Sequence, residues 1–159
     1  MSSETTQETV EQEVTGYVQA PWAMGVVGGL VGGLAMGIVL SVALTSTIES
    51  AIPALYTLDG GAIGWVAHMS HAAIFGVLFA AFVTRSQIKP YTETVTELLG
   101  IGIAYGAVLW VVAASVVMPI WLDAVGFANA PATPNFVPMS LAGHVIFGAV
   151  LGAAYWALR

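Results

Sequence analysis

The sequence predicts an all-α polytopic membrane protein with four transmembrane helices. Its 159 residues are 58% hydrophobic and only 8% charged, whereas soluble domains carry about a quarter charged residues. Four apolar stretches each approach the ~20 residues that a helix needs to cross the hydrocarbon core. A bilayer admits only helices or closed barrels, because every backbone polar group must be satisfied within the protein. The stretches are too long and continuous for barrel strands, so we expect a helix bundle.

The expected helices follow one another along residues 21–159 and leave no room for a soluble domain. The third helix is expected to end before Pro119, because a proline inside a helix removes a hydrogen bond and clashes with the preceding turn. Residues 1–20 are polar and acidic and lack the basic start of a signal peptide. We expect them to form a disordered cytoplasmic tail. The predicted helices span residues 22–44, 61–83, 98–118 and 138–158.

The few basic residues predict the orientation in the membrane. Cytoplasmic loops of membrane proteins are enriched in Lys and Arg. Arg85 and Lys89 lie between the second and third predicted helices, and Arg159 ends the fourth. With four spans, these three residues fall on one side together with the N-terminus. We therefore expect a multi-pass protein of the cell membrane with both termini in the cytoplasm.

The two halves of the chain share a sequence phrase. HAAIFGVLFAA in the second helix parallels GHVIFGAVLGAA in the fourth, with the shared Ile-Phe-Gly 72 residues apart. In each half the preceding helix contains spaced glycines and is followed by a loop with proline. Internal symmetry is common in membrane folds. We predict a tandem duplication of a two-helix unit with parallel repeats; chance likeness between apolar helices is the alternative.

Rows of glycine predict where the helices pack. Residues four apart lie on one face of a helix, and a glycine face lets another backbone approach closely, which favours association in lipid. The partner helix can belong to the same chain or to another subunit. We therefore expect the protein to contact the lipid bilayer and to form a homo-oligomer or join a larger membrane complex. The helix-packing residues are Gly25, Gly29, Gly33, Gly37, Gly102, Gly106, Gly148 and Gly152.

All three histidines fall inside predicted helices. An ionisable residue within a span is costly and marks a functional site by default. His68 and His144 each lie on a row of small residues, roughly 10 Å below the outer ends of helices that run in the same direction. His71 is turned toward a bulkier face but stays within reach of the side that carries His68. The serines of the spans fall mostly in the same outer half, so we expect one polar layer.

The first hypothesis is a cofactor site between the second and fourth helices, in a redox or assembly subunit. Facing helices of bundles are where such sites are built. His68 or His71, with His144, would provide axial ligands for haem b, although the outer half has no Arg or Lys for the propionates. In the other version the three histidines bind copper or zinc, with Met69 or Met139 as soft thioether ligands.

Two other hypotheses need no cofactor. In a structural or assembly protein, neutral imidazoles would be core polar groups that hydrogen-bond to serine, to the backbone or to one another. In a small transporter or channel subunit, they would take part in proton or ion movement. A complete path needs polar groups on both sides of the midplane, and the inner half offers little beyond Tyr105.

The composition excludes several other classes of function. The chain has no cysteine, so it has no disulfide, thiolate metal site or Cys nucleophile. A net charge of −6 argues against nucleic acid as a partner. Walker A, His-Glu-x-x-His and Gly-x-Ser-x-Gly motifs are missing, so we do not expect an enzyme. This halophile-like composition and the small Gly-rich four-span pattern resemble uncharacterised membrane proteins of haloarchaea; the resemblance covers the whole chain, has no diagnostic motif and implies no activity.

Overall fold

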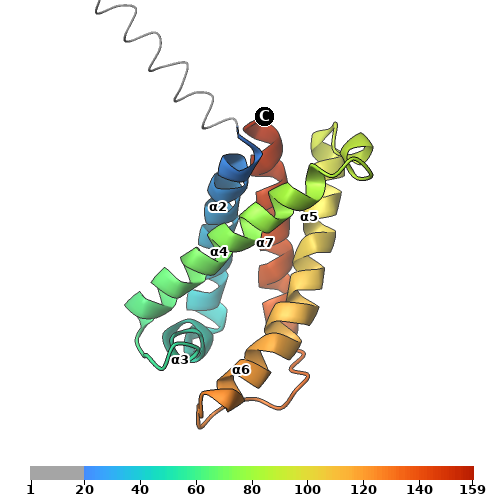
Figure 1. Ribbon diagram of the computed structural model, residues 1–159. Coiled ribbons are helices and arrows are strands. Elements are labelled where there is room, and N and C mark those ends of the chain that lie inside the picture. The colour runs from blue at the N-terminus through green and yellow to red at the C-terminus, as the bar shows by residue number, and fades with distance from the viewer. Residues whose placement is uncertain (1–19) are drawn as a thin grey trace, which may run out of the picture.

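A computed structural model describes residues 20–159, in which all regular structure is helical (Figure 1). The prediction of a four-helix membrane protein is confirmed, because four helices are long and apolar enough to cross a bilayer. Short elements lie between them: η1 (Thr47–Ala51), α3 (Ile52–Ala54) and η2 (Lys89–Tyr91). Residues 1–19, which carry nearly all of the predicted tail, lie outside the described residues. The four spans are α2 (Pro21–Ala43), α4 (Gly61–Val83), the continuous segment Val95–Ala124 and α7 (Pro138–Ala157).

The third span is longer than the predicted range 98–118 at both ends. It consists of α5 (Val95–Leu109), η3 (Trp110–Val117) and α6 (Met118–Ala124). Its start is fixed by a capping box, in which the side chains of Thr94 and Glu97 each accept a hydrogen bond from the backbone of the other residue. The backbone N–H of Glu97 donates to Thr94 Oγ1 at 3.2 Å, and the backbone N–H of Thr94 donates to Glu97 Oε2 at 2.8 Å. The helix therefore begins at Val95, before the apolar run itself.

The expectation that this helix stops at Pro119 is wrong, because α6 continues to Ala124. A proline has no N–H for the carbonyl four residues before it. That carbonyl belongs to Ser115, and it accepts a 2.8 Å hydrogen bond from the backbone N–H of Asn135 instead. The loop that follows the helix thus satisfies the group that the proline leaves free. An unsatisfied carbonyl at a buried position is expensive, and Ser115 is fully buried.

Pro53 in α3, which follows the first span, is accommodated in the same manner. The carbonyl four residues earlier belongs to Glu49, and it accepts a 3.0 Å hydrogen bond from the backbone N–H of Gly60. Both prolines follow a π-helical segment, η1 and η3 respectively. At this end of the bundle, which we call the α3–α6 end, each loop is therefore tied back to the helix that precedes it (Figure 1).

Glycines bring the spans into backbone contact in two pairs, α2 with α4 and α5 with α7. A Cβ at Gly76 would lie 2.9 Å from the carbonyl carbon of Gly25 and from Cα of Gly29. A Cβ at Gly102 would lie 3.0 Å from the carbonyl carbon of Gly148. Two carbon atoms ordinarily stay about 3.5–4.0 Å apart. Only glycine permits these crossings without separating the helices.

The other predicted packing glycines also contact helices of the same chain. Gly33 and Gly37 lie against side chains of α4, while Gly106 and Gly152 lie in the α5–α7 crossing. A second row on α2, which includes Gly28 and Gly32, lies against α7. Glycine packing is thus used within the bundle, and the homo-oligomer or larger complex stays a prediction.

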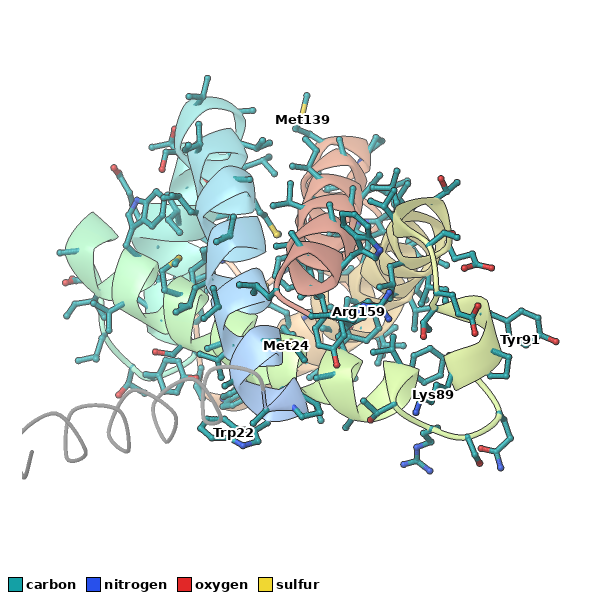
Figure 2. The ribbon with its side chains drawn as sticks, turned by 90° about the horizontal axis from the view of Figure 1, so that it is seen from above. Trp22, Met24, Lys89, Tyr91, Met139 and Arg159 are labelled. Carbon is teal, nitrogen blue, oxygen red and sulfur yellow. The ribbon has the colours of Figure 1, made fainter. Side chains whose placement is uncertain are left out.

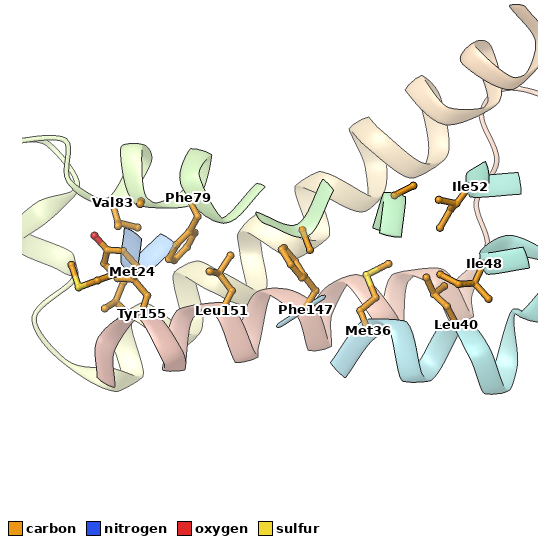
Figure 3. Close-up of a cluster of buried hydrophobic side chains, with 14 residues drawn as sticks. Met24, Met36, Leu40, Ile48, Ile52, Phe79, Val83, Phe147, Leu151 and Tyr155 are labelled. Carbon is orange, nitrogen blue, oxygen red and sulfur yellow. The ribbon is translucent and has the colours of Figure 1, made fainter. Parts of the chain in front are cut away.

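A cluster of buried apolar side chains runs along the bundle (Figure 3). Near the termini, Phe79 packs edge-on against Tyr155 and at a tilt against Tyr105, with ring centroids 5.8 and 5.3 Å apart. Phe79, Leu98 and Leu151 have no exposed surface. Toward the α3–α6 end the cluster continues through Met36, Leu40, Ile48 and Ile52.

Both described ends of the chain lie at the opposite end from α3 and α6. Figure 1 shows the C-terminus beside the start of α2, with the α4–α5 connection at the same end. Figure 2 views the bundle from this end and labels Trp22, Lys89 and Arg159. A guanidinium N–H of Arg159 donates to the backbone carbonyl of Glu93 at 3.2 Å. The chain's three basic residues therefore share one end of the bundle.

Candidate functional site

A cavity of about 210 Å³ lies in the α3–α6 half of the bundle, and all three histidines line it. His68 and His71 come from α4, and His144 comes from α7. Apolar side chains form most of the remaining wall, and the lining contains no Lys, Arg, Asp or Glu. The polar layer therefore consists of imidazoles with the hydroxyls of Thr47 and Ser140.

His68 is held against α2 by a hydrogen bond between helices. It is 7% exposed, and its Nε2 lies 2.8 Å from the backbone carbonyl oxygen of Gly33. Because a carbonyl only accepts, Nε2 must carry the hydrogen in the neutral ring. Nδ1 is then the acceptor nitrogen, and it has no hydrogen-bond partner among residues 20–159. The glycine row of α2 makes this contact possible, since it brings the two helices close together.

His144 is fixed within its own helix. Its Nδ1 lies 2.7 Å from the backbone carbonyl oxygen of Ser140, one turn earlier in α7. Nδ1 therefore carries the hydrogen, and Nε2 at the far side of the ring is the acceptor. Nothing in the described part of the chain hydrogen-bonds to this Nε2. The protein thus uses one ring nitrogen of His144 to orient the ring and leaves the other available.

His71 lies at the side of the cavity that faces α3 and α6. Its Nε2 hydrogen-bonds to the hydroxyl of Tyr56, which follows α3. The Tyr56 ring also packs edge-on against Trp121 of α6, with centroids 6.0 Å apart. Trp121 and Val117 line the cavity and are 42% and 46% exposed, so the cavity reaches the surface of the bundle beside them.

The three-histidine metal site is not formed in the structure. Within residues 20–159, no group of three or more His, Cys, Asp or Glu side chains could hold a metal ion. The two methionines expected as ligands do not line the cavity either. Met69 lies in a shallow groove with Leu30 and Trp65, and Met139 is 47% exposed and projects away from the bundle (Figure 2). The methionines that do line the cavity are Met36 and Met118.

Haem b does not fit this cavity. Pockets for drug-sized ligands measure about 300–1,000 Å³, and a porphyrin is at the large end of such ligands, whereas this cavity is about 210 Å³. The lining also lacks a basic side chain for the propionates. The Nε2 of His68, the nitrogen best placed to ligate iron, donates its hydrogen to Gly33. The structure therefore gives no support to the haem version of the cofactor hypothesis.

Sequence reasoning missed the residues that close the cavity at the α3–α6 end. Leu55 and Met118 line it and also belong to a second apolar cluster, which includes Leu122, Phe127 and Ala130. This cluster, which we call the cap, covers the cavity toward the end of the bundle. No local pattern predicts it, because it joins α3, α6 and the loop that follows α6. Met36 could have been found, since it continues the row that contains Gly28 and Gly32.

No family model, curated protein or solved structure matches the chain. The resemblance to haloarchaeal membrane proteins therefore stays an expectation, and the site is interpreted from its geometry.

Proposed function

We propose that this membrane protein binds a small, neutral, largely apolar ligand in the histidine-lined cavity. The observation that carries the proposal is that His68 and His144, from two different helices, each have one ring nitrogen fixed by the protein and one acceptor nitrogen without a partner. Neither nitrogen is fully enclosed, because the enclosed side-chain atoms without a partner in the described residues are Ser41 Oγ and Trp110 Nε1. A ligand in the cavity that donates hydrogen bonds would pair with both rings.

The size and polarity of the cavity support a ligand of about one substituted ring. An apolar cavity of about 150 Å³ accommodates benzene, and this cavity is about 210 Å³. Phe75 and Phe147 contribute aromatic walls. The absence of ionic side chains from the lining disfavours a charged ligand, because a buried charge needs a partner. A channel is less well supported, since Phe79 and Leu151 fill the core beyond the cavity.

We further propose that the cavity lies in the outer half of the cell membrane. The Lys and Arg residues share the end of the bundle that carries the C-terminus, and such residues favour the cytoplasmic side. Both termini are then cytoplasmic, and the α3–α6 end faces outward.

Nuclear magnetic resonance of the imidazole nitrogens tests the binding proposal directly, because the chain has only three histidines. Phenol is the probe, and benzene, which has the same ring without the hydroxyl, is its control. We expect saturable shifts of His68 Nδ1 and His144 Nε2 with phenol, since these nitrogens gain a hydrogen bond. Benzene should occupy the cavity without these shifts.

Two alanine-to-leucine variants provide the matched comparison. Ala114 lines the cavity, whereas Ala104 lies on the exposed face of α5 in the same span. Ala114→Leu should abolish the phenol shifts, and Ala104→Leu should retain them. Equal behaviour of the two variants, or no saturable shift in the unaltered protein, would overturn the proposal. Stoichiometric copper or zinc in the purified protein, lost in His144→Leu, would replace it with a metal site.

A further inference from the structure

We infer that the ligand is the hydroxylated ring of a membrane-soluble quinol, which enters the cavity sideways from the lipid. This inference rests on the proposed function and adds the class of ligand and its route. Three features carry it: the cap over the α3–α6 end, the exposed rim beside α6, and the two acceptor nitrogens on different helices.

The cap closes the direct route from the aqueous phase. Leu122 is 1% exposed and Leu55 is 7% exposed, and both pack with Phe127 and Ala130 of the loop after α6. The bond from Asn135 to the Ser115 carbonyl holds this loop against the helix. Beyond the cavity on the other side, Phe79 fills the core. A ligand from water would have to displace apolar side chains at either end.

The side of the bundle offers a route instead. Val117 and Trp121 line the cavity and are about half exposed, so a molecule that reaches this surface can contact the interior. Because η3 belongs to a helical segment that is long and apolar enough to cross a membrane, the inference places this surface against lipid chains. A molecule dissolved in the bilayer can thus place a ring in the cavity and leave an apolar tail outside.

The hydrogen-bonding pattern selects a ring with two donors. The acceptor nitrogens Nδ1 of His68 and Nε2 of His144 belong to α4 and α7, so they approach a ligand from different helices. A quinol carries two hydroxyls on opposite sides of one aromatic ring and can donate to both. The oxidised quinone has only carbonyl oxygens at these positions and would leave both nitrogens unpaired. A site built to pair with a hydroxyl rejects the analogue that lacks it.

The test compares a decyl-substituted benzoquinol with the corresponding benzoquinone, using full-length protein in lipid nanodiscs. Binding is followed through the imidazole nitrogen signals, under argon for the reduced form. We expect the quinol to bind at least about tenfold more tightly than the quinone, because two hydrogen bonds of ordinary net strength together amount to about one such factor. Equal affinity of the two forms would overturn the inference.

The route is tested by narrowing the rim. Val117 lines the cavity, whereas Val112 is exposed on the same span without lining it. Val117→Trp should weaken decylbenzoquinol at least about tenfold, since the tail has to pass this position, while Val112→Trp should leave it unchanged. Equal effects of the two variants would contradict sideways entry.

Phenol separates failure of the inference from failure of the proposed function. If phenol shifts the histidine signals and decylbenzoquinol does not, the cavity binds small ligands but not quinols, and the inference is wrong. If neither molecule gives a saturable shift, the proposed function itself fails.

Discussion

The close crossing of α5 and α7 predicts how much stability the protein loses when a single methyl group is added to α5. Gly102→Ala places a Cβ closest to the carbonyl oxygen of Gly148, and also 3.0 Å from the carbonyl carbon of that residue and 3.3 Å from Cα of Gly152. These atoms belong to a helix backbone and cannot rotate away. Gly100→Ala, two residues earlier in α5, meets nothing within 4 Å. The two variants add the same atom to the same helix and differ only in what that atom contacts.

The expected magnitude follows from the distances. An ordinary carbon contact of about 3.5–4.0 Å requires the helices to separate by at least roughly 0.5–1 Å, since the carbonyl oxygen lies nearer than the carbon. Such a gap forfeits a quarter to a half of the dispersion energy at the affected contacts. Overpacking of this kind costs about 1–3 kcal/mol. Replacing glycine by alanine favours the helix by up to about 1 kcal/mol, but this gain is common to both variants. Gly102→Ala should therefore be about 1–3 kcal/mol less stable than Gly100→Ala.

The free energy of unfolding can be measured by titrating the protein in mixed micelles with sodium dodecyl sulfate and recording circular dichroism. Gly100→Ala should match or exceed the stability of the unaltered protein. If the two variants agree within about 0.5 kcal/mol, which is the usual range for surface substitutions, the close approach of α5 and α7 is refuted.

The remaining predictions concern the start of α5 and the orientation in the membrane. Thr94→Ala removes the cap that accepts from Glu97 and should cost about 1 kcal/mol in the same titration; Thr96→Ala, whose side chain makes no hydrogen bond in the described chain, is the control and should change little. For the orientation, single cysteines in this cysteine-free chain are informative. An impermeant maleimide should label Asp123→Cys in intact cells and Lys89→Cys only after lysis; the reverse pattern would invert the proposed topology.

The sequence predicted the second and fourth spans almost to the residue, because glycine clusters and a proline mark their starts. The predicted range 61–83 coincides with α4, and 138–158 differs from α7 by one residue. The third span was underestimated for two physical reasons. The Thr94–Glu97 cap extends a helix into polar sequence. The effect of Pro119 is offset by a hydrogen bond from Asn135, and no local pattern reveals a partner that is 16 positions further along.

The candidate site was only half predictable. Residues four apart share a helix face, and this rule alone places His68 on the buried row that packs against α2. Met139 precedes Ser140 by one position, so the same rule places it on a different face of α7 from Ser140. By contrast, Tyr56 and Trp121 come from segments at the end of the bundle. Their positions depend on tertiary packing, so periodicity within the spans carries no information about them.

The shared Ile-Phe-Gly places a glycine at a close helix crossing in each half of the bundle. Gly76 lies against Gly25 in the first pair of spans, and Gly148, 72 residues later, lies against Gly102 in the second. In each half a proline also follows a π-helical segment, in α3 and in α6, and the carbonyl that it leaves free is satisfied by the following loop. The duplication of a two-helix unit stays a prediction from the sequence, but these shared contacts are what such a duplication would preserve.

The polar groups of the cavity, unlike the glycines, differ between the two halves. This difference limits what the site can bind. In the alignment that pairs Gly76 with Gly148, His144 corresponds to Ala72, and His68 corresponds to Ser140. All four line the cavity. A haem held symmetrically by the two halves would require imidazoles at corresponding positions, and none of the histidines has such a counterpart. The shared Ile-Phe-Gly therefore provides a packing glycine in both halves, whereas the two acceptor nitrogens arise where the halves differ. An asymmetric site of this kind suits a single organic ring that meets each helix with a different hydroxyl.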